Sequence, residues 1–484
     1  MELTSNPTSH PPQFAAIVAG NIDGRSINVR YRQRQFHRLQ ASILNRLAEF
    51  KHAIAQDSGH SPEEVQAEVC LAMKEIRSHY LSLNIEESLQ VEYRVAHGQD
   101  NLTQRRSAGI VYIIPTTHTI FYSVVVALSA ALAEGNCIIL ELPKTTWRVT
   151  ALLRSVLVTA MDADTFAISE TRPDEKFLRT TLLVNQQSSD ILPTAFGLLS
   201  SPSGLRAVAV VDRTANLQEA ATDLVSSRFA LNGRSPYAPD MVLVNQFCMQ
   251  PFIELVIKHA AKLLTSDGPG PATVPKHGKE PSMLDKIGSE NGVKVIVSGT
   301  SWAVVKVHNR NSTLLQSKIK ERLLVLHPMS SLDDAINLCN DTGAHAATYT
   351  FAAHDAAKYV SESIDAHTAW INHVPYDMLF GPMIPLNSPL SLSTRYTPES
   401  FGVPRPQVVN RSGNTVLAKS LLEGKVPKSI RSAQEFLSPL PEIEQRPGHK
   451  IGFFEQGIIT GGLITLTSLI TIVSAAGYWA LRMR

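Results

Sequence analysis

The sequence has almost no excess of charge of either sign. Lysine and arginine together number 45, aspartate and glutamate number 43, and the formal net charge is +2. Proteins that bind nucleic acid usually carry a basic face, because the phosphate backbone attracts lysine and arginine. We therefore expect no nucleic acid among the partners of this chain.

Cysteine is scarce as well, and the four cysteines are far apart, at Cys70, Cys137, Cys248 and Cys339. Disulfide frameworks and zinc sites need cysteines, or cysteines and histidines, at short regular spacings. The 16 histidines show no ligand spacing either. The pattern indicates buried thiols in a reducing compartment and predicts no metal site.

The N-terminal residues Met1–Gln13 are polar, contain prolines, and lack the basic start and apolar stretch of a secretory signal. A different segment lacks charge entirely: Gly457–Leu481 is 25 residues long and lies between Glu455 and Arg482. That length can cross the hydrocarbon core of a bilayer, and a buried core helix is the alternative interpretation. We expect a single C-terminal membrane anchor, with the bulk of the chain in the cytosol and the endoplasmic reticulum as a plausible membrane.

Helical and strand patterns follow one another along the rest of the chain. Residues 1–28 are expected to be disordered, and apolar residues from Phe36 to Ile54 then recur at the spacing of one amphipathic helix. Ser61, Pro62 and Glu64 form the start signal of a second helix. Short apolar runs at 110–114, 137–140, 207–211, 241–245 and 294–298, with helical patterns between them, predict an α/β fold with largely parallel sheets. Ser266–Glu280 is expected to be a surface loop, and residues 410–450 a linker before the membrane helix.

Several segments resemble the aldehyde dehydrogenase superfamily, in order and in spacing. The matching segments are Gly109–Ile114, Ala131–Leu140, Tyr237–Val244, Ser331–Ile336 and Trp370–Asn372. The resemblance covers roughly Val29–Gln407. With the C-terminal membrane helix added, the chain is similar to the fatty aldehyde dehydrogenases, and divergent tail-anchored relatives occur in fungal secondary-metabolite clusters.

The resemblance implies the division of the chain into domains. A Rossmann-like cofactor domain is expected at residues 29–202, interrupted by an oligomerisation strand at 92–104. A catalytic domain would follow at 203–390, and residues 391–409 would supply further oligomerisation strands for a homodimer. The cofactor implied is NAD or NADP, and the reaction is attack of a cysteine thiolate on an aldehyde, followed by hydride transfer and hydrolysis assisted by a glutamate.

The two catalytic residues of the family are missing from their expected positions. The family nucleophile lies in a Gly-Gln-x-Cys segment before Ala-Pro-Asp; here residues 233–240 read GRSPYAPD, which places Pro236 at the cysteine position. The family base opens a Glu-Leu-Gly-Gly-Lys segment, which here reads PSGLR and places Pro202 at the glutamate position. The two prolines are 34 residues apart, as base and nucleophile are in the family. Proline supplies neither a thiolate nor a proton-transfer group.

Other family positions differ too. His118 occupies the position of the asparagine that binds the oxyanion, and it can still donate a hydrogen bond. Glu141 stands where the family has a lysine that contacts the adenosine ribose. Lys318 and Lys320 lie in the segment that contacts the nicotinamide ribose. The glycine-containing phosphate loop is replaced by residues 185–189, NQQSS, although close approach to a pyrophosphate normally needs glycine.

Alternative interpretations remain open at four of these positions. A shift of one residue would place Ser235 at the nucleophile position, and Cys248 is a second substitute nucleophile or a packing cysteine. His118 is either a structural histidine or a catalytic one. The basic residues of 318–322 form either a solvated face or the binding site of an anionic ligand.

Two hypotheses for the function follow. In the first, the chain is a membrane-anchored homologue of aldehyde dehydrogenases that has lost thiol chemistry and acts in binding, scaffolding or regulation. In the second, it is an active NAD(P)-dependent oxidoreductase of a lipophilic aldehyde, in a biosynthetic pathway, with a rearranged site. The distance of any cysteine or glutamate from Pro202 and Pro236 distinguishes the two.

Overall fold

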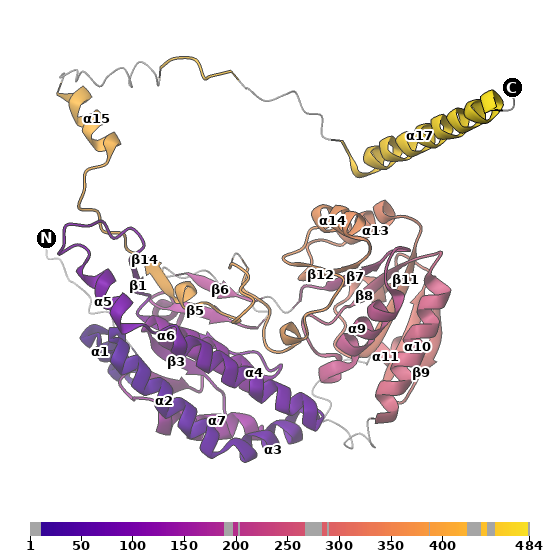
Figure 1. Cartoon of the computed structure of the whole chain (residues 1–484). Helices are drawn as coiled ribbons and strands as arrows, with labels where there is room; N and C mark the ends of the chain where they lie inside the picture. The colour runs from indigo at the N-terminus through magenta and orange to yellow at the C-terminus, as the bar shows by residue number, and fades with distance from the viewer. Residues whose placement is uncertain are drawn as a thin grey trace, which may run out of the picture. The chain divides into compact units, whose positions relative to one another are not determined.

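The computed structural model of the chain describes residues 11–187, 197–201, 204–266, 283–287, 290–386, 388–423, 437–442 and 451–482. It divides into two compact units. The first, which we call the body, consists of residues 1–352 and 360–409, and the second consists of residues 353–359 and 410–484. Figure 1 shows the elements of each unit.

The first sheet of the body has five parallel strands in the order β4-β3-β2-β5-β6. Its strands are β2 (Ile110–Ile114), β3 (Cys137–Glu141), β4 (Phe166–Ser169), β5 (Leu182–Asn185) and β6 (Leu198–Ser200). Alternate residues of β2 enter different clusters: Val111 and Ile113 join the large core, whereas Tyr112 packs with Ile17 of the N-terminal segment. The sheet is therefore buried on both faces, as a parallel sheet requires.

Helices cover both faces of this sheet (Figure 1). They are α1 (Ala15–Asp23), α2 (Val29–Asn45), α3 (Leu47–Ser58), α4 (Pro62–Leu81), α6 (Ile120–Glu134), α7 (Arg148–Ala160) and α8 (Glu175–Leu178). Helix α5 (Ile85–Tyr93) follows α4 and has no buried residue. The start signal of α4 is confirmed, because Ser61 and Glu64 form a reciprocal capping box. The prediction of a single helix between Phe36 and Ile54 is wrong. Helix α2 ends at Asn45 and α3 begins at Leu47, because Arg46 between them has non-helical backbone angles, with φ of −118° and ψ of 25°.

The second sheet of the body has seven strands in the order β13-β12-β7-β8-β11-β10-β9. They are β7 (Ala207–Val211), β8 (Met241–Asn245), β9 (Val293–Ser298), β10 (Trp302–Val307), β11 (Arg322–Met329), β12 (Ala347–Phe351) and β13 (Ala369–Ile371). All of its pairings are parallel except that of β9 with β10. The associated helices are α9 (Leu217–Phe229), α10 (Met249–Ser266), α11 (Met283–Lys286), α12 (Thr313–Gln316) and α13 (Leu332–Asn340). Helix α14 (His354–Ser363) follows β12 in the sequence and includes residues of both units.

The expected disorder of residues 1–28 is wrong where the structure describes them, from residue 11 onward. Helix α1 is held by buried apolar side chains: its N-cap residue Phe14 and Ile17 within it are each 1% exposed. Phe14 also stacks on Phe177, with ring centroids 5.2 Å apart. Apolar burial of this kind compensates the conformational entropy lost on ordering the segment.

The expected strand boundaries near the oligomerisation segments are also corrected. Residues 92–104 contain the end of α5 and a turn, and the strand is β1 (Arg105–Ser107), which pairs with β14 (Gly402–Pro404). Within 391–409, β14 is the only strand among the described residues. The linker expected at 410–450 contains a helix, α15 (Gly413–Leu422), whose N-cap is Ser412. Residues 267–282, which include nearly all of the predicted surface loop, lie outside the described residues.

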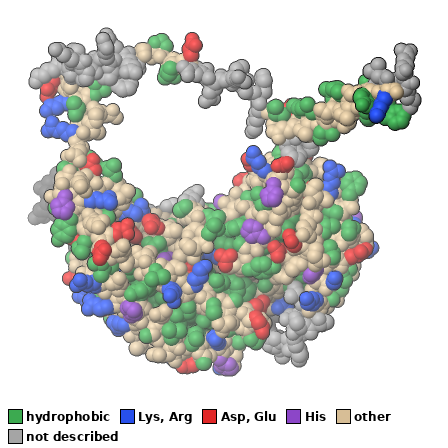
Figure 2. Space-filling view, in the orientation of Figure 1, with side chains coloured by type: hydrophobic (Ala, Val, Ile, Leu, Met, Phe, Trp, Pro, Cys, Tyr) green, Lys and Arg blue, Asp and Glu red, His purple; other side chains and the backbone are tan. Residues whose placement is uncertain are grey.

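The C-terminal apolar segment is one helix, α17 (Phe453–Arg482). Residues Glu455–Ala476 within it are apolar and long enough to cross a membrane, and none of that window is buried in the protein. Figure 2 shows the described part of α17 without acidic or basic side chains along most of its length. Exposed Ile and Leu over 22 residues make α17 a candidate membrane span and disfavour the core-helix alternative.

Candidate functional site

The loop between β2 and α6 carries His118, at the position expected to bind the oxyanion. Its Nε2 lies 2.9 Å from the carbonyl oxygen of Leu379, and because a carbonyl only accepts, Nε2 is the donor. Burial lowers the pKa of His118 to about 4, so the ring is neutral at physiological pH. The next residue, Thr119, has φ of 41° and accepts a hydrogen bond from the backbone N–H of Gly381 at 2.7 Å. His118 therefore links α6 to the 379–381 segment, which favours the structural interpretation.

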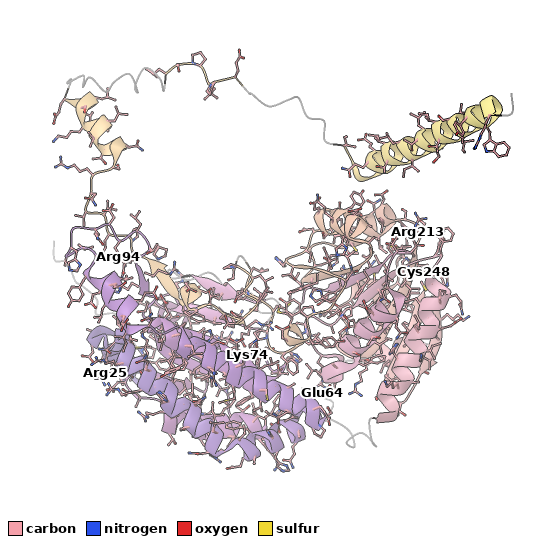
Figure 3. The ribbon with its side chains drawn as sticks, viewed as in Figure 1. Arg25, Glu64, Lys74, Arg94, Arg213 and Cys248 are labelled. Carbon is pink, nitrogen blue, oxygen red and sulfur yellow. The ribbon has the colours of Figure 1, made fainter. Side chains whose placement is uncertain are left out.

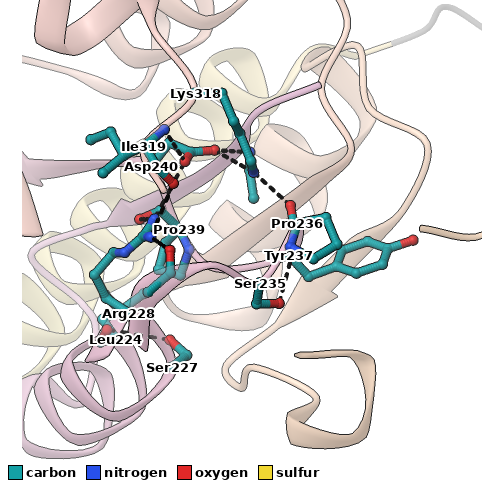
Figure 4. Close-up of polar contacts among 12 residues, drawn as sticks. Leu224, Ser227, Arg228, Ser235, Pro236, Tyr237, Pro239, Asp240, Lys318 and Ile319 are labelled. Atoms are coloured by element: carbon teal, nitrogen blue, oxygen red, sulfur yellow. Dashed lines mark hydrogen bonds and ion pairs between the residues drawn. The ribbon is translucent and has the colours of Figure 1, made fainter. Parts of the chain in front are cut away.

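The turn before β8 carries Pro236, at the position expected for the nucleophile. Pro236 is buried, and its carbonyl oxygen accepts a hydrogen bond from Nζ of Lys318 at 2.6 Å. The turn is reached through η3 (Ala230–Gly233), where Gly233 has φ of 69° and lies so close to the backbone of Glu321 that a Cβ would be only 2.3 Å from its carbonyl oxygen. Figure 4 shows Lys318 pointing toward both Pro236 and Asp240.

Asp240 is the centre of a buried charged cluster beside this turn. Its Oδ2 lies 2.8 Å from Nζ of Lys318 and its Oδ1 lies 3.4 Å from Nη1 of Arg228. The same carboxylate accepts backbone N–H groups from Ala207 at 2.8 Å and Ile319 at 3.0 Å. Burial lowers the pKa of Lys318 and of Arg228, and the charge of Asp240 opposes that shift in both. One carboxylate thus holds two cations, the first residue of β7 and the segment that precedes β11.

The basic run at 318–322 is divided between two environments. The side chain of Lys318 is 9% exposed and paired with Asp240, so the solvated-face interpretation is wrong for this residue. Lys320 is exposed, as that interpretation expects. Glu321 accepts the backbone N–H groups of Met283 and Leu284, each at 3.1 Å. Within this run, Lys318 therefore connects two segments of the body, whereas Lys320 faces solvent.

Ser235, the substitute nucleophile that a shifted alignment would supply, is 1% exposed. Its Oγ accepts a hydrogen bond from the backbone N–H of Tyr237 at 3.2 Å. Among the described residues, no histidine or carboxylate is hydrogen-bonded to this Oγ. A serine without a base within reach stays protonated and is a poor nucleophile.

Cys248, the second substitute, lies directly before α10, where Figure 3 labels it. Its Sγ lies 3.3 Å from the carbonyl oxygen of Asn245, which is a helix-start contact. Burial raises the pKa of this thiol, which makes it a weaker nucleophile at neutral pH. The geometry favours the packing interpretation of Cys248.

Glu141, at the position expected to contact the adenosine ribose, ends β3. Its carboxylate accepts two hydrogen bonds from Arg172, at 3.0 Å and 3.1 Å, and one from the hydroxyl of Tyr112 at 2.8 Å. The glutamate side chain is only 10% exposed. The negative charge introduced at this position is therefore neutralised within the body.

Some expected site residues cannot be placed. Pro202, the base position, and Ser188 and Ser189 of the expected phosphate loop lie outside the described residues. Asn185 and Gln187 of that loop are described, and Gln187 donates from its side chain to the carbonyl oxygen of Pro115 at 2.9 Å. Among the residues that the structure does describe, no three His, Cys, Asp or Glu side chains are grouped as metal ligands would be.

The comparisons with known proteins agree with the topology of the two sheets. The family model described as "Aldehyde dehydrogenase family" matches residues 20–168 and 201–381, which is more than half of the chain. This chain belongs to the aldehyde dehydrogenase family. Among curated relatives, aldehyde dehydrogenase family 3 member B1 of Rattus norvegicus is 24% identical over 360 residues, which cover 68% of this chain and 75% of the relative. The protein of the same name from Mus musculus is 24% identical over 361 residues.

Solved structures show the same aldehyde dehydrogenase fold. A substrate-bound AldH of Staphylococcus aureus has a TM-score of 0.66 at 16% identity, covering 88% of this chain and 99% of that protein. The glyceraldehyde-3-phosphate dehydrogenase of Methanocaldococcus jannaschii, complexed with NADP, has a TM-score of 0.61 at 14% identity and covers 75% of this chain and 84% of that protein. An NAD-dependent benzaldehyde dehydrogenase of Corynebacterium glutamicum has a TM-score of 0.61 at 15% identity, and the match covers 83% of this chain and 88% of that protein. At these identities the likeness concerns the fold.

The residues of this aldehyde dehydrogenase family member do not fit a dinucleotide well at two of its expected contacts. Glu141 already accepts three hydrogen bonds from Arg172 and Tyr112. Lys318 is engaged with Asp240 and Pro236. Both side chains are therefore already committed to contacts inside the body, and we derive no reaction step through NAD or NADP.

Sequence reasoning missed the partners that neutralise the altered residues. Asp240 was visible as the last residue of the Ala-Pro-Asp match, but its role depends on Arg228, which lies twelve positions away on α9. Arg172 pairs with Glu141 across 31 positions. In the sequence, the only sign of such a pairing is an acidic residue at or near a family position whose charge has changed. The basic residue that pairs with it is identified by the three-dimensional contacts alone.

Proposed function

We propose that the chain is a membrane-anchored aldehyde dehydrogenase-like protein that serves in binding, scaffolding or regulation and does not oxidise aldehydes by the family's thiol mechanism. The observation that supports this most strongly is the contact of Lys318 with the carbonyl oxygen of Pro236 at 2.6 Å. The position expected to carry the thiolate is a proline, and a cation anchored to Asp240 holds its backbone. A thioester step has no nucleophile in this arrangement.

The two substitutes for the missing nucleophile support the same proposal. Ser235 is buried and takes part in a backbone turn, and Cys248 has a raised pKa at the start of α10. His118 donates to Leu379, so its Nε2–H is already used and is not directed at a developing oxyanion. None of these groups replaces the pair of base and thiolate that the family mechanism needs.

The anchor belongs to the same proposal. Helix α17 would hold the body at a membrane surface, with the body in the cytosol and the endoplasmic reticulum as the proposed location. A homodimer through the region of β1 and β14 is proposed from the family resemblance. In the competing hypothesis, the same anchor would bring an active NAD(P)-dependent enzyme to a lipophilic aldehyde.

Titration with dinucleotide tests the proposal directly. Full-length protein in detergent, titrated with NAD and with NADP in a calorimeter, should show no saturable binding at millimolar concentrations. An active aldehyde dehydrogenase in the same detergent is the positive control. Saturable binding at micromolar concentrations would favour the competing enzyme hypothesis and contradict the loss of the cofactor contacts at Glu141 and Lys318.

A further inference from the structure

A pocket in the body lies where the C-terminal end of α3 and the first half of α4 meet the N-terminal ends of α6 and α7, elements that are labelled in Figure 1. Apolar and polar side chains both line it. They include Ile54, His60, Glu68, His118, Trp147 and Arg234. The pocket therefore offers both apolar surface and hydrogen-bonding groups to a ligand.

Carboxylates from neighbouring helices satisfy both helix N-termini at this pocket. Oδ2 of Asp57 accepts the backbone N–H of Val149 in α7 at 2.8 Å, and Oε1 of Glu68 accepts the backbone N–H of Tyr122 in α6 at 3.3 Å. An anion would normally be favoured at such helix ends. Here these backbone donors are already engaged by the protein's own carboxyl groups, so they are not available to a further anion.

The second carboxyl oxygen of Glu68 has no hydrogen-bond partner in the part of the chain that the structure describes. The residue is 1% exposed, and among the described residues no donor contacts Oε2. An unpartnered buried polar atom costs about 1–3 kcal/mol unless water or a ligand completes its hydrogen bonds. Because Glu68 also lines the pocket, a molecule that enters the pocket can supply the missing contact.

Two histidines line the same pocket and are neutral. His60 is 8% exposed, and its buried Nδ1 has no hydrogen-bond partner among the residues that the structure describes. His118 uses Nε2 to donate to the carbonyl oxygen of Leu379. Nδ1 of His118 is therefore a hydrogen-bond acceptor, because a neutral imidazole carries one donor and one acceptor nitrogen. Burial lowers the pKa of His60 to about 3 and that of His118 to about 4, and it raises the pKa of Glu68 to about 7. The two imidazoles thus carry no charge near neutral pH, and the carboxyl group of Glu68 is partly protonated there.

These groups select a ligand by its hydrogen-bonding pattern. Arg234 lines the pocket together with Glu68 and Asp57, so a ligand with a full charge of either sign would meet a group of its own sign as well as one of the opposite sign. An aldehyde only accepts hydrogen bonds, so it cannot donate to an imidazole acceptor. A hydroxyl both donates and accepts, which suits a neutral imidazole together with a carboxyl group. We propose that this pocket binds the hydroxyl end of a neutral alcohol, whose apolar chain lies against Ile54 and Trp147.

The inference rests on the binding function proposed above and names its ligand class. It needs neither NAD nor turnover, so its failure is distinguishable from failure of that proposal. The test uses full-length protein in lipid nanodiscs and ligand-observed saturation-transfer NMR. Four three-carbon probes differ only at one end: 1-propanol, propanal, propylammonium and propionate. We expect 1-propanol to bind with a Kd at least about tenfold lower than the other three, since buried polar groups discriminate strongly against ligands that leave them unpaired.

Variants of Glu68 distinguish loss of a hydrogen bond to the ligand from loss of the folded structure. Glu68→Leu should weaken 1-propanol binding by about tenfold or more, whereas Glu68→Gln, which keeps a donor and an acceptor, should retain it. Glu63→Gln changes an exposed carboxylate on the same helix and should leave binding unchanged. A thermal unfolding scan checks that each variant is folded. If Glu68→Leu does not fold, His118→Phe takes its place in the same binding test. Equal affinity for all four probes, tightest binding of propanal, absence of any signal, or unchanged binding in a folded variant lacking the polar group would overturn the inference.

Discussion

Nζ of Lys318 lies 2.8 Å from Oδ2 of Asp240, and the same ammonium group donates to the carbonyl oxygen of Pro236 at 2.6 Å. Asp240 also contacts Arg228, so the cluster has two cations and one carboxylate in a buried setting. Each member depends on the others, because an isolated buried charge is strongly unfavourable. The altered residue at 318 has thus become part of the framework of the body.

Replacement of Lys318 tests this structural role. Lys318→Met should lower the free energy of unfolding by about 3 kcal/mol, because it removes one partner of a buried ion pair and frees the carbonyl group of Pro236. Urea unfolding of the full-length protein in detergent measures the change. The exposed neighbour gives the control: Lys320→Met should change stability by no more than about 0.5 kcal/mol. Equal effects of the two substitutions would contradict the cluster.

The pH dependence of stability follows from the buried Glu68, whose pKa is raised to about 7 by burial. The carboxyl group of Glu68 is protonated in both states below its unfolded pKa of 4.5, and the folded state is penalised increasingly as pH rises from there to about 7. Glu68→Gln removes this titration. The stability of the variant relative to the wild type should therefore rise between about pH 4 and pH 8, by about 3 kcal/mol at most. A stability difference that stays constant between these pH values would show that the pKa of Glu68 is not raised in the folded protein.

Thiol reactivity distinguishes the four cysteines. Cys70 is exposed, whereas the other three are buried, and burial raises the pKa of Cys137 to about 11 and that of Cys339 to about 12. The thiolate is the reactive form, so iodoacetamide should label Cys70 first in the native protein. Mass spectrometry of the labelled peptides measures the order. Labelling of Cys248 ahead of Cys70 would indicate an activated thiol and would weaken the packing interpretation.

Much of the fold was predictable because local patterns decided it. The apolar runs of β2, β3, β7 and β8 and the capping box at Ser61 are confirmed, since burial on both faces and helix capping leave direct marks in the sequence. The order of strands within each sheet depends on crossovers, which the sequence does not encode locally. For that reason the apolar run of β9 predicts one more strand of a largely parallel sheet, whereas β9 pairs with β10 in the antiparallel direction.

The sequence predicts which positions of the site have changed, but it does not predict what surrounds the changed side chains. Glu141, Lys318 and His118 were identified from the resemblance, but their partners lie far away in sequence: Arg172 for Glu141, and Leu379 for His118. Whether a changed charge faces solvent, a ligand or an internal counter-ion is decided by tertiary packing. The break of one expected helix at Arg46 and the ordering of α1 have the same origin.

The membrane anchor has a direct test. Truncation after Lys450 should move the protein from the membrane pellet to the supernatant, because it removes the apolar helix whose window Glu455–Ala476 has no burial in the protein. Fractionation of cells, with and without an alkaline carbonate wash, measures the change. If the truncated protein still pellets after the wash, α17 is not the element that holds the protein at the membrane.

Steady-state oxidation of a lipophilic aldehyde tests the central claim most directly. Full-length protein in detergent, supplied with NAD or NADP and a medium- or long-chain aldehyde, is followed by the absorbance of the reduced cofactor, with an active family member as the control. The account predicts no turnover above that of the buffer, because the position of the thiolate is Pro236 and its backbone is held by Lys318. Steady turnover that persists in the Cys248→Ser variant would contradict it.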